Sequence, residues 1–299
     1  MFTADAHCDT LLRLEGGLPP GPVSLGTLRR GGVGLQVFAL FHGERPPLTG
    51  AIQRALDQLA RLSSLDIPLL AGPLPKRPPL EPTAVLSIEG SEILEDSLEA
   101  LTRFRRLGVR MMNLTWNHPN TAGMPAMAGR GPLTAFGCRL VDAMGREGVL
   151  CDVSHLNEDG FWTVLERSRL PVVASHSCAR ALCDHPRNLT DRQIKALIEA
   201  GGFMGINFCP AFLREDGQAT LSDICCHIDH VAQLGGIGIL GMGSDFDGID
   251  HVPLGMEDAG CYPALYERLS RMGYRPEDIA AIAGRNLYRT LQRGQEEQT

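Results

Sequence analysis

Short apolar runs alternate along this chain with segments in which apolar residues recur at helical spacing. The apolar runs predict eight strands, over residues 2–9, 33–41, 84–89, 110–116, 149–155, 171–176, 202–208 and 239–246. Between them lie amphipathic segments such as AIQRALDQLARL and TDRQIKALIEAGG, several of which end in glycine, a common helix terminator. A strand and a helix repeated eight times predict an α/β fold of the (β/α)₈ TIM barrel type.

The same pattern covers the whole chain, so we predict a single barrel domain over residues 1–299. Two proline-rich stretches flank one helical segment, the first around Pro46 and Pro47 and the second reading GPLPKRPPLEP. We interpret both as long surface connections within the barrel. The segment after Asn286 is polar, and from about residue 287 we predict a loose tail.

Polar side chains stand where the predicted strands end, which is the edge that carries the active site of such a barrel. In strand order they are His7 with Asp9, Glu89, Trp116, His155, His176, Asn207 and Asp245. A charged or imidazole group in an apolar run is costly unless it is paired or binds a metal ion. Side chains two apart on a strand share a face, so His7 and Asp9 are expected to point into the barrel mouth, with Cys8 turned away. Asp5 shares that face and is expected to be a buried hydrogen-bonding residue.

Five of these residues have metal-ligating side chains, namely His7, Asp9, Glu89, His155 and His176. Five ligands exceed what one tetrahedral zinc ion with an open position needs, and they favour two metal ions that share a carboxylate. Glu89, the one carboxylate of its predicted strand, is expected to bridge them. Zinc suits mixed imidazole and carboxylate ligands, although manganese, cobalt or iron bind the same types. The alternative is that each residue is a separately satisfied core residue, and it requires five independent explanations.

Two further motifs predict residues that act on a substrate. GMGSDFDG places Asp245 at the end of the last predicted strand, where a carboxylate can accept a proton from water and donate it to a leaving amine. The alternative is a structural role in which Asp245 and Asp247 cap the following turn, and it carries more weight for Asp247 than for Asp245. CDHPRNLTD places Arg187 beyond the sixth strand, where a guanidinium can hold a substrate carboxylate; a surface salt bridge is the alternative.

The remaining histidines and the cysteines predict no second metal centre. His227 and His230 are three apart in a helical segment and are interpreted as part of a solvated face. Four other histidines fall in loops near the rim, at positions 42, 118, 185 and 251. The cysteines at 183, 225, 226 and 261 lack paired C-x-x-C spacing, so we interpret them as buried free thiols.

Composition narrows the partners and the location. A net charge of −7 and a pI near 5.7, with scattered Lys and Arg, argue against a nucleic-acid partner. Nine irregularly spaced cysteines predict reduced thiols and hence a cytoplasmic protein. We expect no membrane association, because no run approaches the roughly 20 apolar residues that a membrane span needs and the first residues do not resemble a signal peptide.

The motifs DAHCDT, SIEG, DVSH, ASHS, HPRN and GSDFDG, in this order, resemble those of the membrane dipeptidase (renal dipeptidase) family of metal-dependent, amidohydrolase-like barrels. The resemblance extends from the first strand to about Asp258 and points to a soluble member of the bacterial type. It implies that one zinc ion binds His7, Asp9 and Glu89 and that a second binds Glu89, His155 and His176. It also implies that Arg187 and Asp245 face the substrate, and that the protein is a homodimer.

Two positions depart from the pattern of that family. NLTWNHPN has Trp116, followed by Asn117, where the mammalian enzymes have a histidine that contacts the substrate. NFCPAF has Phe212 where those enzymes have a tyrosine. The indole N–H can still donate a hydrogen bond, whereas Phe212 has no hydroxyl. We predict that Trp116, Asn117 and Phe212 contact the substrate.

These residues together predict a zinc-dependent dipeptidase. In this hypothesis a hydroxide that bridges two zinc ions attacks the peptide carbonyl, Asp245 transfers the proton to the leaving amine, and Arg187 holds a carboxylate of the dipeptide. The alternatives are an amidohydrolase acting on N-acyl amino acids, D-amino acid amides or lactones, and a catalytically silent metal-binding barrel. A phosphoesterase is disfavoured, because of the cationic side chains only Arg187 is well placed to hold a phosphate.

Overall fold

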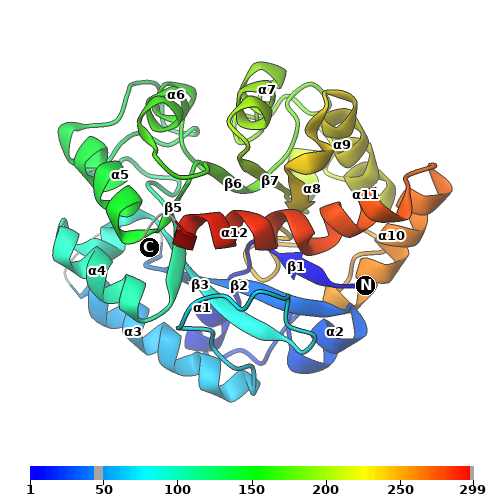
Figure 1. Ribbon diagram of the computed structural model, residues 1–299, viewed down its shortest axis with the longest axis horizontal. Helices are drawn as coiled ribbons and strands as arrows, with labels where there is room; N and C mark the ends of the chain where they lie inside the picture. The colour runs from blue at the N-terminus through cyan, green and yellow to red at the C-terminus, as the bar shows by residue number, and fades with distance from the viewer. Residues whose placement is uncertain (44–49, 297–299) are drawn as a thin grey trace.

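Eight parallel strands close into a barrel in chain order in the computed structural model, which describes residues 1–43 and 50–296 (Figure 1). The strands are β1 (Thr3–Asp5), β2 (Val33–Phe41), β3 (Thr83–Glu89), β4 (Val109–Asn113), β5 (Leu150–Asp152), β6 (Val173–Ser177), β7 (Phe203–Ile206) and β8 (Leu240–Met242). Between successive strands the chain forms helices that pack outside the barrel. The predicted (β/α)₈ fold is confirmed.

Several strands are shorter than predicted, and this changes where the polar residues lie. β1 ends at Asp5, β5 at Asp152 and β8 at Met242. His7 and Asp9 therefore belong to the loop between β1 and the next helix, not to a strand, although the chain still makes one parallel bridge there, between Cys8 and Phe246. The prediction that His7 and Asp9 lie on one strand is wrong, and their convergence comes from the loop.

Several helices begin where the sequence supplies a capping side chain. Thr190 accepts a hydrogen bond from the backbone N–H of Gln193, whose side chain accepts one in return, and Thr220 and Asp223 form the same capping box. The α-helices are α1 (Thr10–Glu15), α2 (Leu25–Arg30), α3 (Ala51–Arg61), α4 (Leu98–Arg106), α5 (Ala135–Glu147), α6 (Glu158–Arg167), α7 (Asp191–Glu199), α8 (Pro210–Leu213), α9 (Leu221–Gln233), α10 (Tyr262–Arg271), α11 (Pro276–Ala280) and α12 (Asn286–Glu296). Shorter helical turns are η1 (Leu62–Leu65), η2 (Ser91–Leu94), η3 (Gly236–Gly238), η4 (Ala259–Cys261) and the π-helical η5 (Ala281–Arg285).

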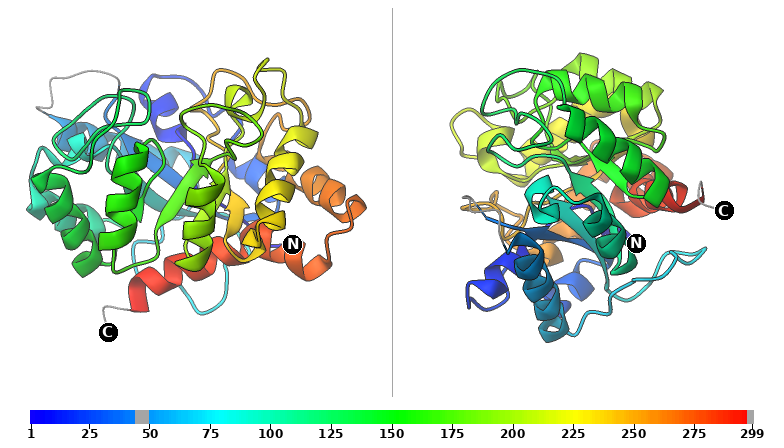
Figure 2. Two further views of the ribbon diagram at one scale, coloured as in Figure 1. Left: turned by 90° about the horizontal axis from the view of Figure 1, so that it is seen from above. Right: turned by 90° about the vertical axis from the view of Figure 1, so that its left-hand side faces the viewer.

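The C-terminal helix α12 replaces the predicted loose tail. Leu287, Tyr288 and Leu291 are buried and belong to the apolar cluster that fills the lower part of the barrel with Ala4 and Leu35. Figure 1 shows α12 crossing the barrel, and Figure 2 shows it below the other helices, on the side where the chain begins. The prediction failed because it rested on the polar composition of the segment and overlooked its few apolar residues, which recur at helical spacing. Residues 297–299 lie outside the described residues.

The two proline-rich stretches differ in what the structure describes. Pro46 and Pro47 lie outside the described residues. The second stretch, residues 72–82, connects η1 to β3 across the surface, as predicted, and its Leu80 is 92% exposed. The hydroxyl of Tyr288 donates to the carbonyl of Pro75 and so fastens this connection to α12. Among residues 1–43 and 50–296 no helix is both long enough and apolar enough to cross a membrane.

Candidate active site

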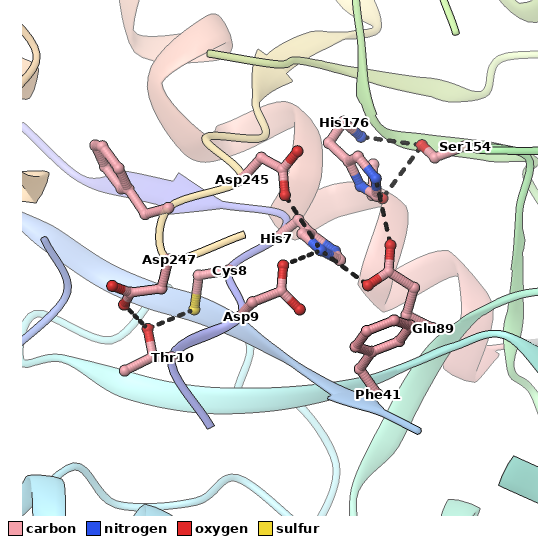
Figure 3. A network of polar contacts seen from close by, with 12 residues as sticks. His7, Cys8, Asp9, Thr10, Phe41, Glu89, Ser154, His176, Asp245 and Asp247 are labelled. Atoms are coloured by element: carbon pink, nitrogen blue, oxygen red, sulfur yellow. Dashed lines mark hydrogen bonds and ion pairs between the residues drawn. The ribbon is translucent and has the colours of Figure 1, made fainter. Parts of the chain in front are cut away.

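Polar side chains gather at the C-terminal ends of the strands. His7 and Asp9 come from the loop after β1, Glu89 from the end of β3, His155 from the loop after β5, His176 from β6 and Asp245 from the loop after β8. All six are buried, with at most 8% of any residue exposed. Figure 3 shows His7, Asp9, Glu89, His176 and Asp245 pointing toward one another from these separate elements. The structure therefore brings together every residue predicted as a metal ligand.

Glu89 lies between two sets of ligands. Its Oε1 atom is 3.0 Å from His155 Nε2 and 3.6 Å from His176 Nε2, while its Oε2 atom is 3.6 Å from His7 Nε2. On the second side, His7 Nε2 also lies 3.3 Å from Asp9 Oδ2. The two oxygens of one carboxylate thus face opposite groups, which is the arrangement that a bridging carboxylate requires.

The ligand atoms are arranged for metal ions more than for hydrogen bonds to one another. The Nε2 atoms of His155 and His176 are 2.9 Å apart, and in neutral rings both can carry a lone pair, which a shared cation would satisfy. Asp9 Oδ1 is buried and accepts no hydrogen bond from any residue that the structure describes. Two triads, His7–Asp9–Glu89 and Glu89–His155–His176, each have ligand atoms within 4.8 Å of one another. Imidazole nitrogens and carboxylate oxygens grouped in this way can hold two divalent cations.

Electrostatics at the two triads differ. Burial lowers the pKa of His155 and of His176 far below the usual range, so both rings are neutral and keep a lone pair for a metal. Burial also acts to lower the pKa of His7, but the carboxylates of Glu89 and Asp9 outweigh it and raise that pKa to about 10. Burial raises the pKa of Glu89 and of Asp245. A field that favours a proton on His7 also attracts a metal cation.

Asp245 is held by Asn207, a residue that the sequence pattern placed at a strand end but to which no function was assigned. Asn207, in the loop after β7, donates from Nδ2 to Asp245 Oδ2 at 2.9 Å. The Oδ1 atom of Asp245 lies 3.8 Å from His7 Nε2. Asp245 has a φ of 61°, in the left-handed region that non-glycine residues seldom adopt, and such conformations concentrate at functional sites. A lone polar residue at the end of an apolar strand was the signal for Asn207.

Below the centre, Asp5 is the buried hydrogen-bonding residue that was predicted. Its Oδ1 accepts from the backbone N–H of Ser244 at 2.9 Å, and its Oδ2 accepts from the hydroxyls of Ser244 at 2.5 Å and Tyr262 at 2.9 Å. Among the described residues, none in the following turn donates a hydrogen bond to Asp247, so the turn-capping role considered for it is not observed. Its Oδ2 accepts from Thr10 Oγ1 at 2.7 Å and so ties the loop after β8 to α1, which lies alongside because β1 and β8 are neighbours.

His227 is not on a solvated face, as had been predicted, but is buried. Its Nδ1 accepts from the backbone N–H of Ala179 at 3.1 Å, and its Nε2 donates to the carbonyl of Leu213 at 3.1 Å. The helix α9 packs this ring against the segment after β6 and the end of α8, which follow two neighbouring strands. His230 is half-buried and lies 2.7 Å from Asp191.

Beside the ligand cluster lies a cavity of about 600 Å³, and Arg187 lines it. Arg187 is 4% exposed, its guanidinium lies 5.5 Å from the centre of the Phe212 ring, and no described residue accepts a hydrogen bond from its Nε or Nη2. Burial lowers its pKa, while Asp245 and Glu89 act to raise it. A buried guanidinium with free N–H groups is expensive unless a ligand pairs with it. The surface salt bridge considered for Arg187 is absent from the described part of the chain.

The other three residues predicted to contact substrate also line this cavity. Trp116 packs against Phe41, with ring centres 4.9 Å apart, and lies 6.1 Å from the ring of His155. Asn117 Oδ1 lies 2.9 Å from His155 Nδ1. Phe212 packs against Arg187 and against the ring of His185. Their contacts with a substrate stay predictions.

Several known proteins are similar to this chain in sequence and in fold. The family model described as membrane dipeptidase (peptidase family M19) matches residues 80–299. A crystal structure of a metallo peptidase from Rhodobacter sphaeroides, liganded with a phosphinate mimic of the dipeptide L-Ala-D-Ala, is similar over 98% of this chain and 99% of its own, with a TM-score of 0.88 and 28% identity.

Two curated relatives give the extent of the sequence similarity. An uncharacterized protein in the pqqA 5' region of Klebsiella pneumoniae is 37% identical over 218 residues, which are 69% of this chain and 80% of that protein. Dipeptidase 3 of Rattus norvegicus is 31% identical over 285 residues, and the match covers 91% of this chain but only 58% of the rat protein. The chain therefore belongs to the membrane dipeptidase family, peptidase family M19.

Proposed function

We propose that this protein is a zinc-dependent dipeptidase that hydrolyses the peptide bond of dipeptides. The observation that carries the proposal is the position of Glu89 between two ligand triads, at the wall of a cavity that also holds Arg187. The guanidinium of Arg187 is buried, and its Nε and Nη2 have no hydrogen-bond partner among the described residues. The Rhodobacter sphaeroides structure, which holds a phosphinate mimic of L-Ala-D-Ala, supports dipeptides as the substrate class.

Two Zn²⁺ ions per chain are part of the proposal. His7, Asp9 and Glu89 would hold one ion, and Glu89, His155 and His176 the other, with Glu89 and a water or hydroxide shared between them. When bound, the zinc ions polarise the scissile carbonyl and lower the pKa of the water that attacks it. Mixed imidazole and carboxylate ligands are a combination that zinc binds readily.

Asp245 is proposed as the proton shuttle. It lies beside the first triad, with Oδ1 3.8 Å from His7 Nε2, and Asn207 fixes its other oxygen. From this position the carboxylate can take a proton from the attacking water and give it to the leaving amine. The left-handed backbone at Asp245 is part of the local conformation that presents this side chain to the cluster.

Arg187 is proposed to bind the carboxylate of the dipeptide through the N–H groups that no described residue uses. Because Arg187 and the ligand cluster line the same cavity, the carboxylate and the scissile bond of a short peptide can be held together. Trp116 and Phe212 would form apolar walls around the substrate.

The test combines metal analysis with a substrate panel. Purified protein loaded with zinc is assayed for metal content per chain and for cleavage of L,L and L,D dipeptides, N-acyl amino acids, D-amino acid amides and lactones. The proposal predicts two zinc ions per chain and the highest kcat/KM on dipeptides. Higher rates on another panel member would move the function to that class, and two bound ions without any hydrolysis would identify a silent metal-binding barrel. An Asp245→Asn variant that kept the full rate would contradict the proton-shuttle role.

Location and assembly complete the proposal. The nine cysteines are all free thiols, which supports a cytoplasmic protein. The homodimer implied by the family resemblance stays a prediction, and light scattering of the purified protein measures it directly.

A further inference from the structure

The three histidines of the ligand cluster differ in what their Nδ1 atoms contact. Nδ1 of His155 lies 2.9 Å from Asn117 Oδ1, and Nδ1 of His176 lies 2.8 Å from Ser175 Oγ. Nδ1 of His7 is buried and has no hydrogen-bond partner among the described residues. Two of the three rings are therefore held at Nδ1, the ring nitrogen that does not face the ligand cluster. For His155, the residue that makes this contact is 38 positions away in the sequence.

Asn117 belongs to the loop after β4, and this loop forms several hydrogen bonds with His155 and with its neighbour Asn157. The backbone N–H of Ala126 donates to the carbonyl of His155 at 2.7 Å, and the N–H of Asn157 donates to the carbonyl of Met124 at 3.2 Å. Asn117 contacts the ring from the same loop. One loop thus fixes both the backbone and the side chain of His155.

The backbone of His155 needs such support. Its φ is 68°, in the left-handed region that costs a non-glycine residue free energy unless the surroundings hold it. In this conformation Nε2 of His155 lies 3.0 Å from Glu89 Oε1 and 2.9 Å from His176 Nε2. Rotation of the ring would remove Nε2 from the ligand triad.

The tautomer of His155 follows from the same geometry. A neutral imidazole carries one proton, and a ring that offers the Nε2 lone pair to a metal carries that proton on Nδ1. The Nδ1–H group then needs an acceptor, and the carboxamide oxygen of Asn117 is within hydrogen-bond distance. Partners of this kind raise the metal affinity of a histidine ligand, and their loss costs about 10-fold to 100-fold in affinity.

We infer that Asn117 is a positioning residue for the metal centre. Its carboxamide oxygen fixes the tautomer and the orientation of His155, and it thereby sets the affinity of the ion held by Glu89, His155 and His176. The inference rests on the proposed function only in requiring that the cluster bind metal ions. It differs from the substrate contact predicted for Asn117, because a substrate contact would alter kcat/KM and leave metal affinity unchanged.

The experiment titrates metal-free protein with Zn²⁺ in competition with a chromophoric chelator, without any substrate. Asn117→Leu keeps the approximate size and removes the acceptor, whereas Asn117→Asp keeps an oxygen at that place. We expect one of the two ions to bind about 10-fold to 100-fold more weakly to Asn117→Leu, the other ion to be unchanged, and Asn117→Asp to restore most of the loss. His118→Leu is the matched control, since His118 is exposed and adjacent in the same loop.

Nitrogen NMR of the histidine side chains in the metal-free protein gives a second readout. His155 should be the Nδ1–H tautomer in the wild-type protein and a mixture in Asn117→Leu, and Asn117→Ala serves if the leucine variant does not fold. Wild-type affinity for both ions in the variants, or an unchanged tautomer, would overturn the inference. A protein that behaves as expected here and yet cleaves no dipeptide would overturn the proposed function alone.

Discussion

A methyl group added to Gly248 would lie 2.1 Å from Asp9 Oδ2. Asp9 belongs to the first ligand triad, and the same added atom would lie 2.7 Å from Asp245 Oδ1. Only a residue without a side chain leaves room there for both carboxylates. The glycine after the SDFD sequence therefore bears directly on the shape of the candidate active site.

We expect Gly248→Ala to lower activity by at least about 100-fold, because small displacements of catalytic groups have effects of that size. Zinc affinity at the His7–Asp9–Glu89 triad should fall as well, and chelator competition measures it. Gly238→Ala is the control, since an added methyl at Gly238 meets no atom within 4 Å. Full activity in Gly248→Ala would show that Asp9 and Asp245 can move apart without consequence.

Asp245→Asn should lower kcat by about 100-fold to 10,000-fold, the usual contribution of a positioned proton-transfer group. The amide keeps the size of the carboxylate and can still contact Asn207, so the number of zinc ions per chain and the KM should change little. Steady-state kinetics on a dipeptide, with metal content measured on the same sample, tests this. A rise in KM with kcat intact would assign Asp245 to substrate binding instead.

Arg187→Met should separate binding from stability. Loss of a charge-assisted contact of about 1.5–3 kcal/mol predicts a KM roughly 10-fold to 150-fold higher for dipeptides. Thermal stability should stay equal or rise, because the guanidinium is buried and its Nε and Nη2 have no partner in the described chain. Dipeptide amides, which lack the carboxylate, serve as the control substrates. If the variant loses equally on dipeptides and on their amides, Arg187 does not recognise the carboxylate.

Zinc should stabilise the fold by an amount that grows with the logarithm of the ratio of the zinc concentration to its Kd. Each ion at 100 times its Kd adds about 2.7 kcal/mol to the free energy of unfolding, which corresponds to a rise of about 4 °C in Tm for a chain of this length. Differential scanning fluorimetry of chelator-treated protein, with and without added Zn²⁺, measures the shift. Mg²⁺, which prefers oxygen ligands, should give no comparable stabilisation. Equal shifts with both ions would argue against the imidazole-containing sites.

His227 should make stability depend on pH. Burial lowers its pKa below the usual 6.5, with His230 acting in the same direction and the Leu213 carbonyl and Asp223 opposing it. The unfolded chain therefore binds the proton more readily, so this contribution to stability is present above about pH 6.5 and is lost as the pH falls below it. Urea unfolding of metal-free protein between pH 5 and 8 should give a smaller loss toward acid in His227→Gln than in the wild type. The same loss in both proteins would exclude this role.

The residues that converge in the candidate site could be predicted from the sequence because strands of a barrel are apolar, so that each polar residue at a strand end stands out. His155 and Asp245 were placed there in this way even though β5 and β8 end before them. Where packing between distant segments decides, the sequence pattern failed. The burial of His227 depends on segments that follow the neighbouring strands β6 and β7, and Asp247 bonds to Thr10, which is remote in sequence.

The helix α12 also joins the two ends of the chain. Phe2 packs edge-on against Tyr288, with ring centres 5.7 Å apart, and β1 is held between β2 and β8. His7 follows β1, and the apolar cluster around β1 contains Ala4 together with Leu287 and Tyr288 of α12. The position of His7 therefore depends in part on α12. Loss of α12 would uncover Phe2 and the apolar cluster beneath β1, next to the loop that carries His7 and Asp9. We therefore expect a truncation that removes Tyr288 to weaken metal binding at the His7–Asp9–Glu89 triad as well as the fold itself.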